Sequence, residues 1–205
     1  MLLPDTMTIH PSDLEIRRIV TDSDLDGVVT AAILRRWWTD AEVVFGHPGE
    51  LRAGVYDELI DEWTAICDLP VHPNCGLSID HHQSNRPEQN ETRAIVVWKD
   101  KPSAARIAFE LFHQIIDLSD LEGLLEWVDK IDSGSISKEE FLSNDPAIWL
   151  SRIVDSEEGT ASWILEQLRV GVSTEEILND PKISKLVSEK EEELGLLNEI
   201  ILSTM

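Results

Sequence analysis

Short apolar runs that alternate with helical segments are the feature that most constrains the fold of this chain. Such runs occupy residues 16–21, 42–46, 64–68, 77–80 and 94–98. Helical spacing appears at 27–38 and again around Val55, Leu59 and Trp63. Strands that alternate with helices predict a parallel or mostly parallel sheet that is covered on both faces.

The second half of the chain lacks further strand patterns. After Pro102, residues 103–116, 121–130, 149–154 and 160–170 all have helical spacing, and Pro181 opens a last amphipathic segment that runs to about residue 202. The sequence therefore predicts an α/β fold. We expect an approximately five-stranded, Rossmann-like sheet flanked by helices, with an all-helical C-terminal part.

Composition limits the kinds of partner. The 205 residues include 40 acidic and 17 basic side chains, a formal net charge of -23, and such a surface repels long polyanions such as long nucleic acids. Cys67 and Cys75 match neither a metal knuckle nor a disulfide framework. No apolar stretch of about 18 residues and no signal peptide are present, so we expect a cytoplasmic protein with no membrane partner.

Carboxylates gather in the loop after the first predicted strand. Asp22, Asp24 and Asp26 alternate there, and Gly27 lets the chain turn into the next helix. In an open α/β sheet, ligands bind beyond the carboxyl ends of the strands, where this loop should lie. Hard oxygen ligands suit manganese or magnesium, so these three aspartates are candidate metal ligands.

This loop is compatible with two other interpretations. Asp-x-Asp-x-Asp-Gly also begins a calcium-binding EF-hand loop, but a strand precedes it here and position twelve, which needs a carboxylate, is Ile33. A solvated acidic turn without a ligand is the second alternative. Against it, Asp68 and the triplet Asp80-His81-His82 follow two more predicted strands and should reach the same sheet edge.

The sequence resembles the DHH phosphoesterase superfamily over roughly residues 16–135. The first family motif matches residues 22–27 (Asp-Ser-Asp-Leu-Asp-Gly) in its RecJ-like form, the second matches Asp68, and the third matches Asp80-His81-His82. Known members include RecJ nucleases, oligoribonucleases, cyclic-dinucleotide phosphodiesterases, exopolyphosphatases and family II pyrophosphatases. The ordered combination of motifs is highly specific.

The resemblance implies roles for these residues. Asp24, Asp26, Asp68 and His81 would be metal ligands, together with Asp22 in the same loop. His82 would face the substrate phosphate, and Asp80 would orient both histidines, so the triplet forms the catalytic group. The fourth family motif adds one more aspartate. Asp129 is the favoured match and Asp132 is the second choice.

The sequence departs from the family in two places. Val20 stands where pyrophosphatase and oligoribonuclease forms carry a histidine, which disfavours those subclasses. Family enzymes also continue into a second, glycine-rich and basic substrate-binding domain, and no such motif occurs here. We expect a catalytic domain at 1–180 and a helix at 181–205 that resembles the linker to that second domain, in a truncated chain or a single-domain variant.

The function expected is metal-dependent hydrolysis of a small phosphodiester or phosphoanhydride. Two divalent ions, Mn²⁺ first and Mg²⁺ as the alternative, would clamp the phosphoryl group and activate water. Short oligonucleotides, cyclic dinucleotides and polyphosphate are the candidate substrates, and Arg106 is a weak candidate for binding them. The alternative function is a binding or scaffold module without activity of its own. The oligomeric state is open, a homodimer included.

Overall fold

A five-stranded parallel sheet forms the centre of the protein. The computed structural model describes residues 9–87 and 92–204. The strand order is β2-β1-β3-β4-β5, and every neighbouring pair runs parallel. The strands are β1 (Arg18–Thr21), β2 (Glu42–Phe45), β3 (Thr64–Cys67), β4 (Leu77–Asp80) and β5 (Ile95–Trp98). The predicted α/β fold and all five predicted strands are confirmed.

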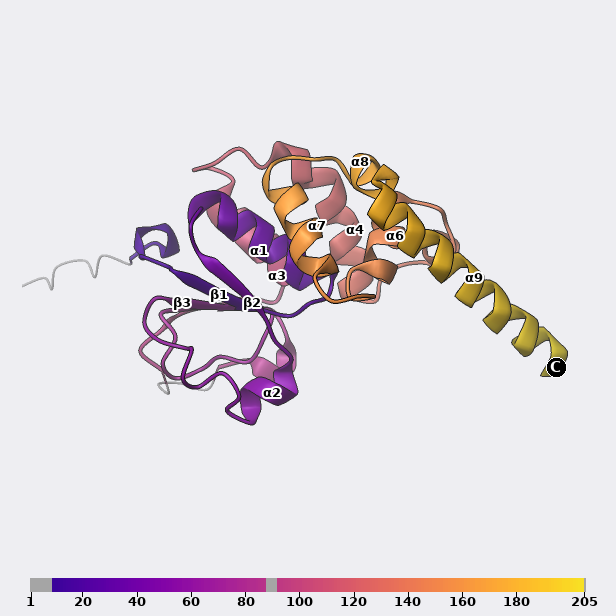
Figure 1. Ribbon diagram of the computed structural model, residues 1–205. Helices are drawn as coiled ribbons and strands as arrows, with labels where there is room; N and C mark the ends of the chain where they lie inside the picture. The colour runs from indigo at the N-terminus through magenta and orange to yellow at the C-terminus, as the bar shows by residue number, and fades with distance from the viewer. Residues whose placement is uncertain (1–8, 88–91, 205) are drawn as a thin grey trace, which may run out of the picture.

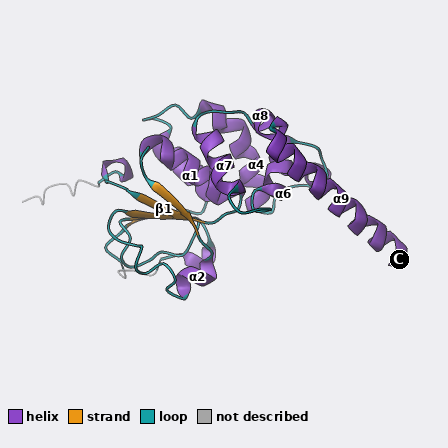
Figure 2. Cartoon of the chain, in the orientation of Figure 1, coloured by secondary structure: helices purple, strands orange, loops and turns teal. Residues whose placement is uncertain are grey.

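Helices make up most of the rest of the described chain (Figure 2). Three single 3-10 turns lie at Pro11–Asp13, Gln83–Asn85 and Ser119–Leu121. The α-helices are α1 (Leu25–Trp37), α2 (Pro48–Arg52), α3 (Ala104–Phe112), α4 (Glu122–Asp132), α5 (Lys138–Phe141), α6 (Pro146–Ile153), α7 (Thr160–Arg169), α8 (Thr174–Asn179) and α9 (Pro181–Thr204). The helical character predicted after Pro102 is confirmed.

The two faces of the sheet are covered unequally (Figure 1). The large core lies between one face and the helices α1, α3, α4, α6 and α7, where Ile19, Cys67 and Ile79 point from the strands. The smaller core on the other face contains Val20 and Ile66, which pack against Leu51 of α2 and the loops beside it. Alternation of side chains along each strand sends neighbours such as Ile19 and Val20 to opposite faces.

One predicted helix does not form. The segment around Val55, Leu59 and Trp63 consists of turns, and the helix between β2 and β3 is the short α2, just before it. Gly54 has a φ of 76°, which ends helical geometry after one turn. Val55, Leu59 and Trp63 are 61%, 41% and 36% exposed, so their helical spacing does not mark a buried face.

The strand register brings three carboxyl ends to the same level. Thr21 is paired with Cys67, and Cys67 is paired with Ile79. The next residues along these strands are Asp22, Asp68 and Asp80. Convergence of three strand ends at one sheet edge, as predicted from the sequence, is therefore built into the hydrogen-bond ladder.

Helix α9 extends away from the rest of the protein at its C-terminal end (Figure 1). Ile183 and Leu186, near its beginning, are buried against the large core, whereas Leu194 and Leu196 are 40% and 62% exposed. The expected helix at 181–205 is thus present up to residue 204, while residues 1–8, 88–91 and 205 of the expected domains lie outside the described residues. None of the described helices is long and apolar enough to cross a lipid bilayer.

Candidate active site

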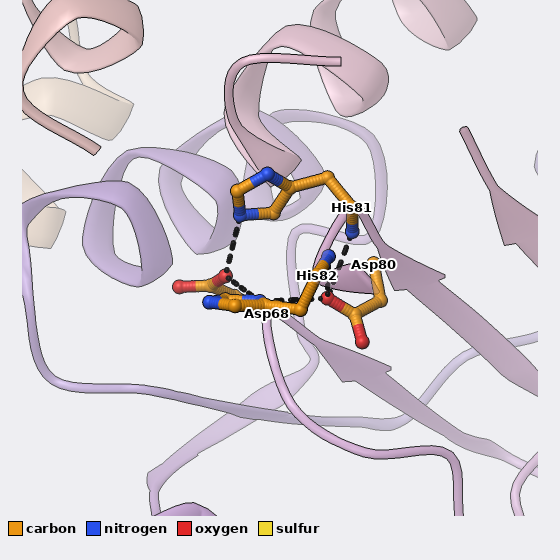
Figure 3. A group of neighbouring side chains, drawn as sticks. All are labelled: Asp68, Asp80, His81 and His82. Atoms are coloured by element: carbon orange, nitrogen blue, oxygen red, sulfur yellow. Dashed lines mark hydrogen bonds and ion pairs between the residues drawn. The ribbon is translucent and has the colours of Figure 1, made fainter. Parts of the chain in front are cut away.

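Asp80 organises the two histidines that follow it (Figure 3). Its Oδ1 atom accepts the backbone N–H groups of His81 and His82, at 2.8 and 3.0 Å, and lies 3.0 Å from Nδ1 of His82. A buried carboxylate in this position favours a proton on Nδ1 of His82 and raises the pKa of that imidazole. The side chain of His82 is 43% exposed, so its other ring nitrogen is open to a ligand.

The orientation of His81 is set from the opposite side. Its Nδ1 lies 3.1 Å from the carbonyl oxygen of Lys101, which can only accept a hydrogen bond, so Nδ1 carries the proton. In the neutral ring, Nε2 then presents a lone pair to three carboxylates. The distances from Nε2 are 3.0 Å to Asp132, 3.5 Å to Asp68 and 3.7 Å to Asp26.

Asp26 is held by the amino end of α3. Its two carboxylate oxygens accept the backbone N–H groups of Ala104 and Ala105, each at 2.7 Å, and the residue is only 2% exposed. Free N–H groups at the beginning of a helix attract negative charge. Ser103 caps the same helix by accepting the N–H of Arg106. These backbone contacts, with a longer one of 3.4 Å from the hydroxyl of Thr30, fix one carboxylate of the site.

Asp68 has an unusual backbone conformation. Its φ of 56° lies in the left-handed region, which residues other than glycine, asparagine and aspartate rarely adopt. The backbone N–H still donates to the carbonyl oxygen of Ile79, at 2.9 Å, so the ladder to β4 continues up to this point. The strained turn aims the buried side chain of Asp68 between the rings of His81 and His82 (Figure 3).

The negative charges of this cluster are poorly compensated by the protein itself. Burial, together with the charges of Asp132 and Asp24, raises the pKa of Asp26 to about 7. Burial and the charge of Asp26 also raise the pKa of Asp68. Burial lowers the pKa of His81, but the carboxylates of Asp132 and Asp68 more than offset this and raise it to about 11. The site therefore attracts positive charge.

Unpartnered polar atoms point to what that positive charge is. Four of the buried side-chain atoms without a satisfied hydrogen bond in the described chain belong to this cluster: Oδ1 of Asp68, Oδ2 of Asp80, Nε2 of His81 and Oδ2 of Asp132. The last two lie 3.0 Å apart and can bond to each other only when Nε2 of His81 carries a proton. Leaving such atoms unsatisfied costs about 1–3 kcal/mol each, and more for charged groups. Carboxylate oxygens and one imidazole nitrogen are ligands for a divalent cation, so the donor set fits a metal ion.

Two groups have ligand atoms close enough together to hold such an ion. One consists of Asp26, His81 and Asp132, and the other consists of Asp68, Asp80, His81 and His82. In each group, the atoms concerned lie within 4.8 Å of one another.

Asp22 and Asp24 line the beginning of α1, beside this cluster. Oδ1 of Asp24 accepts the N–H of Gly27 at 2.9 Å and caps the helix, whereas Oδ1 of Asp22 accepts the N–H of Ser23 at 2.7 Å. Asp24 lines a small hollow together with Asp26 and Asp132. Gly27 is required here because a Cβ atom at this position would lie 2.2 Å from the carbonyl oxygen of Asp22.

The structure separates the two candidates for the fourth motif. The favoured candidate, Asp129, accepts from Oγ of Ser103 at 2.6 Å and forms an ion pair with Arg106 at 2.5 Å. Asp132, the second choice, is the residue that faces His81. The geometry therefore favours Asp132 over Asp129. It also leaves Arg106, the expected substrate-binding residue, engaged with a carboxylate.

Sequence reasoning missed the backbone groups that position the site. The carbonyl of Lys101 and the N–H groups of Ala104 and Ala105 orient His81 and Asp26, yet no side chain marks them. A signal was available, because Ser103 directly after Pro102 is a typical beginning of a helix.

Comparisons with known proteins bear on this site. No protein-family model matches the chain, and no curated protein matches its sequence. Among solved structures, the pGpG-specific phosphodiesterase PggH from Vibrio cholerae matches with a TM-score of 0.71 and 28% identity, over 86% of this chain and 61% of PggH. The exonuclease RecJ bound to manganese matches with a TM-score of 0.60 and 17% identity, over 94% of this chain and 68% of RecJ. The chain thus spans about three fifths of the length of PggH.

Fold and site together define a class of protein: a parallel α/β domain with a cluster of carboxylates and histidines at the carboxyl edge of its sheet. The Asp80-His81-His82 triplet ends β4 in this domain, and both structural neighbours share its fold. The resemblance to the DHH phosphoesterase superfamily that the sequence indicated is confirmed by these two structural neighbours.

Proposed function

We propose that this protein is a phosphoesterase that depends on divalent metal ions. One observation carries the proposal: Nε2 of His81 and the carboxylates of Asp26, Asp68 and Asp132 converge, and three of these four residues have a buried atom without a hydrogen-bond partner in the described chain. A proton or a metal ion is needed between these groups. At neutral pH, a metal ion satisfies several carboxylates at once, whereas a proton satisfies one contact.

The chain's own residues then have distinct tasks. Asp26, Asp68, His81 and Asp132 would hold metal, with Asp22 and Asp24 at the rim of the same site. Bound metal would supply Lewis acidity toward a phosphoryl group and lower the pKa of water. His82, half open to solvent and oriented by Asp80, would bind a phosphoryl oxygen through its free ring nitrogen. Asp80 would act through the histidines rather than on the substrate.

We propose Mn²⁺ as the ion, bound as a pair. RecJ was solved with manganese, and the mixture of carboxylates with imidazole suits manganese better than magnesium, which prefers oxygen ligands. The two overlapping groups of ligand atoms, which share His81, would provide places for two ions.

A short oligonucleotide is the proposed substrate class. PggH acts on the dinucleotide pGpG, and the net charge of -23 disfavours the long nucleic acids on which a processive nuclease would act. A cytoplasmic location remains a prediction from the sequence.

The test is hydrolysis of bis(p-nitrophenyl) phosphate with Mn²⁺ by the wild type, His81→Ala and Asp68→Asn. We expect each substitution to lower the manganese-dependent rate at least about a hundredfold, because loss of a ligand or its support costs that much or more. His113→Ala, at the exposed far end of α3, is the matched control and should retain the wild-type rate.

Two results would contradict the proposal. If the rate of hydrolysis were unchanged after exhaustive chelation, the mechanism would not depend on a metal ion. Tight binding of Mn²⁺ by calorimetry, without hydrolysis of this ester or of any short oligonucleotide, would favour the alternative of a binding module.

A further inference from the structure

Two arginines lie at the turn that follows His82, outside the cluster of metal ligands. Nη2 of Arg52, at the end of α2, donates to Oδ1 of Asn85 at 3.2 Å. Arg86 follows directly and places its guanidinium over the ring of Trp98, 5.1 Å from the ring centroid. The backbone N–H of Asn85 and Nε1 of Trp98 both donate to the carbonyl oxygen of His82, at 3.1 and 2.9 Å. Arg52, Asn85 and Arg86 are called the arginine rim below.

The arginine rim differs from most of the protein's basic residues. Six other arginines are paired with carboxylates: Arg17, Arg18, Arg35, Arg36, Arg106 and Arg169. Arg52 and Arg86 form no ion pair with any carboxylate of residues 9–87 and 92–204, although the chain has 40 acidic residues. Both side chains are exposed. Within the described residues, the two guanidinium groups thus keep donors that could bind an anion.

The position of Arg86 is also organised in advance. Residues 83–85 form a 3-10 turn between His82 and Arg86, and Trp98 at the end of β5 is fixed by its hydrogen bond to His82. The stacked guanidinium gains a cation–π contact and keeps its outer N–H groups available. Ordering the arginine before binding reduces the entropy that an incoming anion would have to offset.

We propose that the arginine rim binds a second, non-reacting phosphate of the substrate. Planar guanidinium groups donate two parallel hydrogen bonds to phosphate oxygens, which is the recognition that free arginines supply best. Four residues span at most about 14 Å, so Arg86 lies within one or two nucleotides of His82. The inference rests on the proposed function and makes it narrower: the preferred substrate is a dinucleotide that carries a terminal phosphate.

The experiment compares pTpT, a dinucleotide with a 5′ phosphate, with TpT, which lacks it. We measure kcat/KM with Mn²⁺ for the wild type, Arg86→Ala, Arg52→Ala and the conservative Arg86→Lys. Arg93→Ala is the matched control, because Arg93 is exposed and precedes β5 at the amino-terminal edge of the sheet, away from the site. All of the alanine variants change the net charge equally.

We expect kcat/KM of the wild type to be about tenfold to a hundredfold higher for pTpT than for TpT. One or two hydrogen bonds between charged groups contribute a difference of this size. Arg86→Ala and Arg52→Ala should reduce this preference toward one, mainly through KM, Arg86→Lys should restore part of it, and Arg93→Ala should leave it intact. A preference that survives in Arg86→Ala and Arg52→Ala, or that falls equally in Arg93→Ala, would overturn the proposal.

Binding separates this inference from the proposed function. Calorimetric titration of pTpT and TpT into the manganese-loaded protein requires no turnover. If the wild type hydrolyses neither the dinucleotides nor bis(p-nitrophenyl) phosphate, the proposed function fails. A tenfold tighter binding of pTpT that is lost in Arg86→Ala would still support the arginine rim. Equal binding of the two dinucleotides to the wild type would refute it.

Discussion

Removal of metal should make the stability of this protein fall as the pH rises from about 4 to 7. Asp26 carries the effect, because its pKa is raised from the ordinary 3.8 to about 7 in the folded state. The folded state then holds a proton that the unfolded state releases. A group of this kind contributes stability that is complete below the unfolded pKa and is lost as the pH rises through the folded pKa.

The magnitude follows from the two pKa values. A rise of about three pH units at about 1.4 kcal/mol per unit gives roughly 4 kcal/mol for Asp26, which is almost fully buried. About 2 kcal/mol of this should be lost between pH 5 and pH 7. His81 acts in the same direction at higher pH, because its raised pKa of about 11 means that the stability from its proton is lost as the pH rises above 6.5.

Manganese should reverse this trend, because the ion takes the place of the protons and binds only the deprotonated ligands. At a concentration of 100 Kd it adds about 2.7 kcal/mol, which corresponds to a rise in Tm of roughly 5–11 °C for a chain of this size. The gain should increase with pH.

Urea unfolding at pH 5, 6, 7 and 8, with chelator or with Mn²⁺, measures both trends. Asp26→Asn is the control. Its amide oxygen can accept only one of the N–H groups of Ala104 and Ala105, so we expect a loss of about 1–3 kcal/mol at pH 5. Its stability should then fall less between pH 5 and pH 7 than that of the wild type, because only Asp68 and His81 still lose protons. Metal-free wild type whose stability stays level or rises between pH 5 and pH 7, in parallel with Asp26→Asn, would refute the reasoning.

Two further substitutions test the geometry. Asp132→Asn should reduce manganese-dependent hydrolysis at least about a hundredfold, because Asp132 faces His81. Asp129→Asn should keep most of the rate and lower the free energy of unfolding by about 1–3 kcal/mol, because it weakens the pair with Arg106. Equal losses of rate in the two variants would contradict this distinction. Gly27→Ala should destabilise by about 1–3 kcal/mol in urea unfolding, because its Cβ meets the carbonyl of Asp22. Gly123→Ala in α4, with nothing within 4 Å of the added Cβ, should instead be neutral or stabilising by up to about 1 kcal/mol, and similar losses in both glycine variants would exclude the steric explanation.

Much of the fold and of the site could be predicted because the signals are local in sequence. Apolar runs located the five strands, and the parallel sheet then brought Asp22, Asp68 and Asp80 to one edge without any knowledge of tertiary contacts. Aspartates at strand ends and a pair of histidines indicate a metal site by their residue types, whatever the exact backbone conformation.

Sequence patterns are less informative where packing decides between neighbouring residues. Asp129 and Asp132 are three positions apart on α4, so periodicity places both on a similar side of the helix. Only the position of Ser103 and Arg106 shows that Asp129 is already engaged. The exposed side chains of Val55 and Leu59 have the spacing of a buried helical face, and Gly54 with its positive φ shows why the segment forms turns instead.

The attachment of Asp26 to the beginning of α3 gives the site its own reporter. The amide protons of Ala104 and Ala105 are both bonded to that carboxylate, and the residues just before them hold His81 through the carbonyl of Lys101. Any local opening that releases these two amides also releases a carboxylate and disturbs a histidine of the metal site. The rate of hydrogen exchange at the two alanines therefore reports how often the site opens locally. This measurement needs neither a substrate nor an activity assay.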